Sequence, residues 1–205
     1  MNWILGNPKI FGILFAFYRM KITFRLMSKK RAFLFLILLL CFSVSSHAQI
    51  KWVSLQEAYT LTQTNPKKII IDVYTDWCGW CKVMDKKTFT NPEVVKFINE
   101  NYYAVKLDAE TKETIKIGGV EYKYNQESRA NDVAIALLQG KMSFPSIVYL
   151  DEKFNMIQPI PGYMEARQFH EVITFLGKDF YKKEAFDLYK NGTYLEVYKD
   201  KLASL

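Results

Sequence analysis

Cysteine and histidine are scarce in this chain, which has three cysteines and two histidines among 205 residues. Cys41 lies in an apolar segment near the N-terminus, so only Cys78 and Cys81 belong to the rest of the chain. One pair cannot form the disulfide framework of a small secreted domain. A tetrahedral zinc site needs four ligands, and His170 alone cannot supply the two that are missing. We therefore expect no metal, and we interpret the pair as functional or as a local staple.

Acidic residues are absent from residues 1–48, which hold seven of the 28 basic residues. The remainder has 21 basic and 21 acidic residues and is formally neutral, although the whole chain carries a formal charge of +7. Nucleic-acid binding depends on a basic surface. Because the remainder has no excess of basic residues, we expect no nucleic-acid partner.

A long apolar run is also missing. The run at residues 32–44 has about 13 residues, whereas a membrane span needs about 18 or more. It follows the basic residues Lys29, Lys30 and Arg31 and precedes a small-x-Ala site at residues 46–48, which is the pattern of a cleavable signal peptide. We expect the signal peptide at residues 27–48 and a mature protein that is exported to the periplasm or the cell exterior, with no membrane span after cleavage.

Two alternatives concern the same region. Residues 1–26 precede a complete signal peptide, so we interpret them as an extension from a mis-chosen start codon, although residues 10–18 could form part of a longer anchor. Lipidation of Cys41 is disfavoured because Leu40 precedes it, where a lipoprotein signal has a small residue. From residue 49 on we expect one domain over residues 49–177 and a helical tail over residues 178–205 that packs on it.

The two cysteines follow an apolar strand. Ile69, Ile70 and Ile71 predict a strand that is covered on both faces, and the chain then enters a helix at Cys78. Two residues between cysteines on the first helical turn bring the sulfur atoms close enough to bond. At the helix start, the thiolate of Cys78 is stabilised by free N–H groups, so we expect Cys78 to be the exposed nucleophile. Cys81 is one turn further in and is expected to be the shielded resolving thiol.

The segment Trp77-Cys78-Gly79-Trp80-Cys81-Lys82 resembles the Trp-Cys-Gly-Pro-Cys-Lys motif of the thioredoxin superfamily. The resemblance extends over about residues 52–176. Tryptophan in place of the motif's proline is more similar to secreted thioredoxin-like proteins and envelope disulfide reductases of bacteria than to cytosolic thioredoxin. The other matching positions are the buried acid Asp72, its lysine partner Lys106, the cis-proline loop at Phe144 and Pro145, and Gly162.

This resemblance implies an α/β thioredoxin fold, with a central mixed sheet flanked by helices. It implies that Asp72 exchanges a proton with Cys81 and pairs with Lys106, although Lys106 could also be an ordinary surface lysine. The residues that it implies for substrate binding are Trp77, Trp80, Phe144 and Pro145. For Trp77 a purely core role and for Trp80 ordinary helix packing remain alternatives; for Pro145 the alternative is a trans turn proline.

An insertion of roughly twenty residues precedes Pro145. Gly118-Gly119 predicts a β-hairpin over residues 114–124, and a helix is predicted over residues 131–139. Because the connections are short, we expect the insertion to lie near the dithiol and to touch substrate, with coverage of a sheet edge as the alternative. In the tail, Asn191-Gly192 is expected to separate two short helices.

The function that these features predict is thiol–disulfide exchange, with no organic cofactor. The expected partners are protein thiols and disulfides and a membrane electron-donor protein, since we favour a disulfide reductase. A disulfide oxidase or isomerase is the alternative, because motifs of this kind span potentials from about −270 to −120 mV. A binding module whose disulfide only staples a helix is the third hypothesis.

Overall fold

A five-stranded mixed sheet forms the centre of residues 49–205, the part of the chain that this computed structural model describes. The strand order is β1-β3-β2-β8-β9; the first three strands are parallel, β8 is antiparallel to β2, and β9 is antiparallel to β8. The predicted signal peptide and Cys41 lie outside the described residues. The strands are β1 (Trp52–Val53), β2 (Lys68–Tyr74), β3 (Tyr102–Asp108), β8 (Ser146–Leu150) and β9 (Met156–Pro161).

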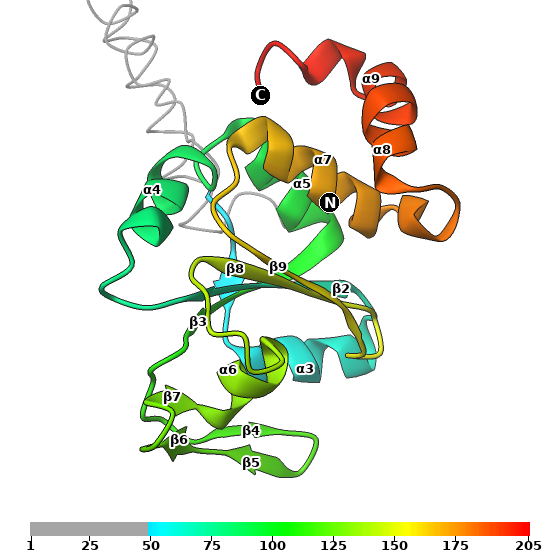
Figure 1. Cartoon of the computed structure of the whole chain (residues 1–205). Coiled ribbons are helices and arrows are strands. Elements are labelled where there is room, and N and C mark those ends of the chain that lie inside the picture. The colour runs from blue at the N-terminus through cyan, green and yellow to red at the C-terminus, as the bar shows by residue number, and fades with distance from the viewer. Residues whose placement is uncertain (1–48) are drawn as a thin grey trace, which may run out of the picture. The chain divides into compact units, whose positions relative to one another are not determined.

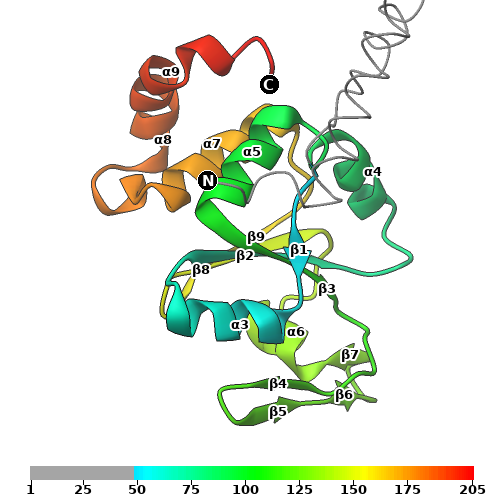
Figure 2. The ribbon, with the colours of Figure 1, turned by 180° about the vertical axis from the view of Figure 1, so that it is seen from behind.

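Helices cover both faces of this sheet (Figures 1 and 2). α3 and α6 lie on one face, and α5 and α7 lie on the other. The predicted α/β fold is therefore confirmed. None of the helices in residues 49–205 combines the length and the apolar character that crossing a bilayer requires. The helices are α3 (Leu55–Thr64), α4 (Gly79–Lys87), α5 (Pro92–Asn101), α6 (Asp132–Leu137) and α7 (Ala166–Gly177).

Local signals in the sequence explain where these helices begin. Ser54 caps α3, and its hydroxyl accepts a hydrogen bond from the Glu57 N–H at 3.1 Å. Asn91 caps α5 in the same way, and Pro92 occupies the first helical position, where its missing N–H costs nothing. Both helix starts therefore follow from side chains that are close in the sequence.

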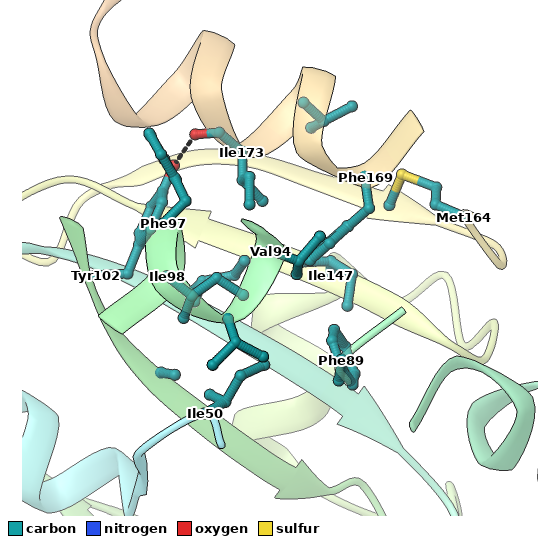
Figure 3. Packing of buried hydrophobic residues seen from close by; sticks show 14 of the residues in the cluster. Ile50, Phe89, Val94, Phe97, Ile98, Tyr102, Ile147, Met164, Phe169 and Ile173 are labelled. Atoms are coloured by element: carbon teal, nitrogen blue, oxygen red, sulfur yellow. Dashed lines mark hydrogen bonds between the residues drawn. The ribbon is translucent and has the colours of Figure 1, made fainter. Parts of the chain in front are cut away.

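The core between the sheet and the pair α5 and α7 is shown in Figure 3. Phe97 and Ile98 of α5 and Phe169 and Ile173 of α7 pack over the sheet, and all four are buried. The Tyr102 hydroxyl donates a hydrogen bond of 2.7 Å to the Ile173 carbonyl, which joins β3 to α7. On the opposite face, a second cluster joins the central strands to α3 and α6.

The insertion has the predicted hairpin, β4 (Ile115–Ile117) and β5 (Val120–Tyr122), and then the unpredicted short pair β6 (Tyr124–Asn125) and β7 (Ala130–Asn131). Its expected position beside the dithiol is wrong. Figures 1 and 2 show β4 and β5 beneath α3 and α6, on the side of the sheet away from α4.

The reason for this position is burial of the hairpin's apolar residues. Ile115 is buried in the cluster that contains α3, and a Cβ added at Gly118 would lie 3.2 Å from the Tyr59 hydroxyl of α3. Burying a side chain such as Ile115 stabilises a fold by about 1.5–3 kcal/mol. The hairpin therefore covers α3.

The tail consists of a 3-10 helix η1 (Phe180–Lys182), then α8 (Phe186–Leu188), the π-helix η2 (Tyr189–Thr193) and α9 (Tyr194–Val197), followed by the 3-10 helix η3 (Lys199–Lys201). The expected break at Asn191-Gly192 is wrong, because the chain is helical from Phe186 through Val197.

Two buried tyrosines explain the continuous helix. The Tyr189 hydroxyl donates to Thr174 Oγ1 at 2.7 Å, and the Tyr194 hydroxyl lies 2.9 Å from His170 Nδ1, so both rings must face α7. They are five residues apart, which is the hydrogen-bond period of a π-helix. The wider turn therefore places both side chains on one face of the tail.

Candidate functional site

Cys78 and Cys81 form a disulfide at the start of α4. Cys78 is the N-cap residue, and its Sγ accepts a hydrogen bond of 3.0 Å from the Cys81 N–H. The Cys78 N–H in turn donates to the Thr75 carbonyl at 3.1 Å. A thiolate at this position would be stabilised by the same N–H group and by the helix dipole. The two sulfur atoms thus differ in their surroundings, because Cys78 Sγ accepts the Cys81 N–H.

The expected exposure of Cys78 is wrong for the disulfide form. Both cysteines are only 4% exposed. Each sulfur of a closed bridge covers the other, and the Cys81 N–H covers part of Cys78 Sγ. The exposure of Cys78 in the disulfide form therefore does not give its exposure in the reduced protein, in which the two sulfur atoms are not bonded.

Asp72 lies on β2 and is 2% exposed. Its Oδ2 atom is 3.4 Å from Nζ of Lys106, its register neighbour on β3. Burial raises the pKa of the Asp72 carboxyl to about 6, and the Lys106 charge opposes part of this shift. The pairing of these two residues agrees with the resemblance.

Asp85 of α4 is a site residue that the sequence reasoning missed. Its carboxylate accepts a hydrogen bond from Lys106 Nζ, and its charge contributes to the raised pKa of Asp72. The available signal was its spacing, because a residue four positions after Cys81 lies on the same face of a helix. Lys106 thus joins a carboxylate on the sheet to one on the dithiol helix.

Three aromatic rings surround the Lys106 ammonium group: those of Tyr74 at 5.2 Å, Trp52 at 5.5 Å and Phe89 at 5.8 Å. Ring faces attract a cation. These rings hold the lysine beside Asp72, so the alternative of an ordinary surface lysine does not apply.

Two polar atoms near the end of β2 have no hydrogen-bond partner within the described part of the chain. They are Asp72 Oδ1 and Thr75 Oγ1, and Thr75 is 1% exposed. A buried polar atom without a partner costs free energy. Such a cost is common at functional sites.

The loop before β8 contains a cis peptide bond between Phe144 and Pro145, as the resemblance implies. The Gly162 N–H donates to the Pro145 carbonyl at 2.8 Å, so the matched glycine supports this loop from β9. Gly162 has φ +101°, a backbone conformation that residues with a Cβ rarely adopt.

Trp77 and Trp80 are 66% and 62% exposed. Both tryptophans are therefore accessible to a partner, and the exposure of Trp77 excludes a purely core role for it. The Trp77 ring packs edge-on against Phe144 at 5.8 Å, and its Nε1–H donates to Glu110 at 3.0 Å. These contacts link Trp77 to the cis-proline loop, so all four proposed substrate-binding residues belong to segments next to the disulfide in sequence or in space.

The fold and this site together define the class of the protein. A mixed sheet between two helical layers, a Cys-x-x-Cys disulfide at a helix start and a cis-proline loop are features of a thioredoxin-fold protein related to thiol–disulfide oxidoreductases. The chain belongs to the family Thioredox_DsbH, which is described as "Protein of unknown function, DUF255" and whose profile matches residues 41–155.

Relatives with this similarity come from bacteria and animals. The thiol:disulfide interchange protein DsbD of Cronobacter sakazakii is 30% identical over 111 residues, which are 53% of this chain and 16% of that protein. The uncharacterized protein B0495.5 of Caenorhabditis elegans is 39% identical over 57 residues, 28% of this chain and 8% of that protein. The chain thus spans less than a fifth of the length of these relatives.

The comparison with solved structures also finds similar chains. One, described as "DsbH Oxidoreductase", is 19% identical with a TM-score of 0.48 and covers 64% of this chain and 86% of its own. A putative disulphide-isomerase from Bacteroides thetaiotaomicron is also 19% identical, with a TM-score of 0.49, and covers 69% of this chain and all of its own.

Proposed function

We propose that this protein is a thiol–disulfide oxidoreductase that exchanges its Cys78–Cys81 pair with disulfides of partner proteins outside the cytoplasm. The observation that carries the proposal is the position of this pair at the start of α4, the helix that Lys106 links through Asp85 to the buried carboxyl group of Asp72, whose pKa is about 6. A disulfide that only stabilised the helix would need no buried carboxyl group nearby, because burying a carboxyl group costs free energy.

In the proposed reaction, the Cys78 thiolate attacks one sulfur of the partner disulfide. The Cys78–partner bond forms, the partner bond breaks, and one partner thiolate leaves. The Cys81 thiol then loses its proton and attacks Cys78 Sγ, which closes the Cys78–Cys81 bond and releases the second partner thiolate. Two electrons pass from the dithiol to the partner, and Trp77, Trp80, Phe144 and Pro145 line the contact surface.

Asp72 is the proposed acceptor of the Cys81 proton. With a pKa of about 6, its carboxylate is largely ionised at pH 7 and can accept a proton, and the resulting acid can release it again. Lys106 and Asp85 act through Asp72 as positioning residues. In the resolving step, Asp72 thus accepts the proton, and Lys106 and Asp85 position Asp72.

We further propose that the exchange runs in the direction of reduction. The support is the resemblance of residues 77–82 to envelope disulfide reductases of bacteria; the similarity to DsbD, a thiol:disulfide interchange protein, supports exchange in either direction. Each reaction cycle passes two electrons to the partner and leaves the Cys78–Cys81 disulfide oxidised. A dithiol donor, which we assign to a membrane protein, must then reduce this disulfide. Equilibration with defined ratios of reduced and oxidised glutathione tests the direction: a potential near −120 mV would favour an oxidase instead.

Export is part of the same proposal, since the partner disulfides that the protein would reduce persist in an oxidising compartment. It rests on the basic, apolar and small-residue pattern of residues 27–48. N-terminal sequencing of the protein from a bacterial periplasmic fraction should give Gln49 as the first residue. Recovery of uncleaved protein in the cytosol would contradict export.

The decisive test of activity is reduction of insulin with dithiothreitol as the electron donor. The wild type should accelerate insulin precipitation, Cys78→Ser should not, and Cys81→Ser should accumulate mixed disulfides that gel electrophoresis without reductant reveals. A wild-type rate equal to that of dithiothreitol alone would favour the binding-module alternative. The partners trapped by Cys81→Ser would identify the physiological substrates.

A further inference from the structure

A groove runs along the free edge of the sheet between β9, α7 and α8. It has a volume of about 340 Å³, which is within the range of ligand-binding pockets, about 300–1,000 Å³. Its walls include Ile160 of β9, Val172 of α7 and Phe186 of α8, and none of its lining residues carries a charge. The polar groups that side chains contribute include the amides of Gln158 and Gln168, which are both exposed.

The groove is continuous with the surface around the disulfide. Tyr163 lines it, and the Tyr163 ring lies 5.3 Å from the ring of Trp80. Trp80 lies between the two cysteines in the sequence. Gly162, next to Tyr163, donates a backbone hydrogen bond to the Pro145 carbonyl. A chain segment that reaches Cys78 can therefore continue past Trp80 and Tyr163 into the groove.

The edge of β9 restricts how such a segment can bind. Pro159 and Pro161 pair with Val148 and Ser146 of β8, and neither proline has an N–H to donate. The Gly162 N–H points toward β8, so the alternation of an antiparallel ladder directs the carbonyls of both prolines outward. The edge can accept hydrogen bonds but cannot complete a strand ladder, and side chains must supply most of the affinity.

We propose that this groove binds an extended, uncharged segment of the partner protein that flanks the partner's reacting cysteine. The inference rests on the proposed function, because it assigns the class of substrate for the same disulfide. An apolar segment matches the uncharged walls, whereas a charged side chain would lose its hydration without gaining a partner. The tail contributes Phe186, so the tail is part of the recognition surface.

Binding can be measured without exchange chemistry. The probe is an acetylated and amidated heptapeptide of valine, isoleucine, phenylalanine and serine, with serine in place of the reacting cysteine. The matched peptide has lysine at two of the apolar positions. Titration followed by tryptophan fluorescence, to which the exposed Trp80 contributes, should show that the wild type binds the apolar peptide at least fivefold more tightly than the lysine peptide.

The variants introduce charge at exposed positions, where folding is not at risk. Gln158→Glu combined with Gln168→Glu should weaken binding of the apolar peptide at least fivefold and strengthen binding of the lysine peptide. Gln63→Glu makes the same change on α3, on the other face of the sheet, and should change neither affinity. Equal affinity of the wild type for the two peptides, or an unchanged preference in the double variant, would overturn the proposal.

A separate measurement distinguishes this proposal from the proposed function. Reduction of hydroxyethyl disulfide by the reduced wild type requires only the dithiol. If the peptide results are as expected and hydroxyethyl disulfide is not reduced, the proposed activity is wrong while the groove stands as a peptide-binding site. If hydroxyethyl disulfide is reduced and the peptides bind alike, the groove proposal is wrong and the activity stands.

Discussion

Lys106 Nζ lies 3.4 Å from Asp72 Oδ2 and also donates a hydrogen bond to Asp85. One ammonium group is thus shared between two carboxyl groups, one buried on β2 and one on the dithiol helix α4. Its attraction lowers the pKa of Asp72, but burial and the charge of Asp85 raise it more, and the result is a pKa of about 6. Three predictions concern the sulfur chemistry that this group would serve.

Asp72→Asn should slow the resolving step without unfolding the protein. The amide keeps the volume of the carboxyl group but cannot accept the Cys81 proton, and loss of such a group typically costs about 10²–10⁴-fold in rate. Stopped-flow decay of a Cys78 mixed disulfide measures the step. In the wild type its rate should fall as the pH drops through about 6, as Asp72 becomes protonated. A variant rate equal to that of the wild type between pH 6 and 8 would return Asp72 to a structural role.

Asp85→Asn should shift this pH dependence to lower pH. Removing the charge of Asp85 removes a cause of the raised pKa of Asp72 and leaves Lys106 free to pair with Asp72 alone. The midpoint of the rate profile reports the change, and the rate at pH 8 should stay near that of the wild type. Asp187→Asn, an exposed change on α8, is the control. A midpoint that does not move would show that Asp85 has no influence on Asp72.

Iodoacetamide should alkylate Cys78 before Cys81 in the reduced protein. The reason is electrostatic, because Cys78 caps α4 and its sulfur accepts the Cys81 N–H. Peptide mapping after brief labelling at pH 7 measures the order. Earlier modification of Cys81 would reverse the assignment of nucleophile and resolving thiol.

The features that could be predicted from the sequence depend on local signals. Ser54 and Asn91 cap helices through contacts within three residues, and the apolar character of β2 follows from its position between two helical layers. The pairing of Asp72 with Lys106 could also be predicted, because the resemblance to thioredoxins implies it.

The features that could not be predicted depend on contacts far apart in the chain. Gly118 and its hairpin lie against α3 because Ile115 is buried there, which no local pattern indicates. The tail is helical without a break because Tyr189 and Tyr194 both contact α7. From the local sequence, Gly192 was expected to end a helix. Asp85 became a site residue only through Lys106 on another element.

Gly177→Ala should destabilise the protein. A Cβ at this position would lie 2.7 Å from the Tyr102 hydroxyl, which is itself bonded to the Ile173 carbonyl, and 3.1 Å from the Phe97 ring. Overpacking of this kind costs about 1–3 kcal/mol. Gly192→Ala is the matched control, since nothing lies within 4 Å of its Cβ, and it should stabilise the helical tail by roughly 0.5–1 kcal/mol. Urea unfolding of both variants measures these changes, and equal effects would contradict the packing of α7 on β3.

The last prediction concerns stability between pH 4 and 7, where two buried groups act in opposite directions. Burial raises the pKa of Asp72 from 3.8 to about 6, so the native state binds more protons than the unfolded state in this range and Asp72 makes stability fall as the pH rises. Burial lowers the pKa of His170 from 6.5 to about 4, so the unfolded state binds more protons and His170 makes stability rise with pH. The two effects largely cancel in the wild type.

Asp72→Asn removes the first effect and leaves the second. Its free energy of unfolding should therefore rise from pH 4 to pH 6.5, whereas that of the wild type should stay nearly level. Because a shift of one pKa unit corresponds to 1.36 kcal/mol, the variant should match the wild type at pH 4 and exceed its stability by roughly 1–3 kcal/mol at pH 7. Urea unfolding of the oxidised proteins at several pH values measures this difference, with the exposed change Asp200→Asn as control. A variant that is less stable than the wild type at pH 7 would show that the carboxylate of Asp72 stabilises the fold through Lys106 and that burial does not dominate its pKa.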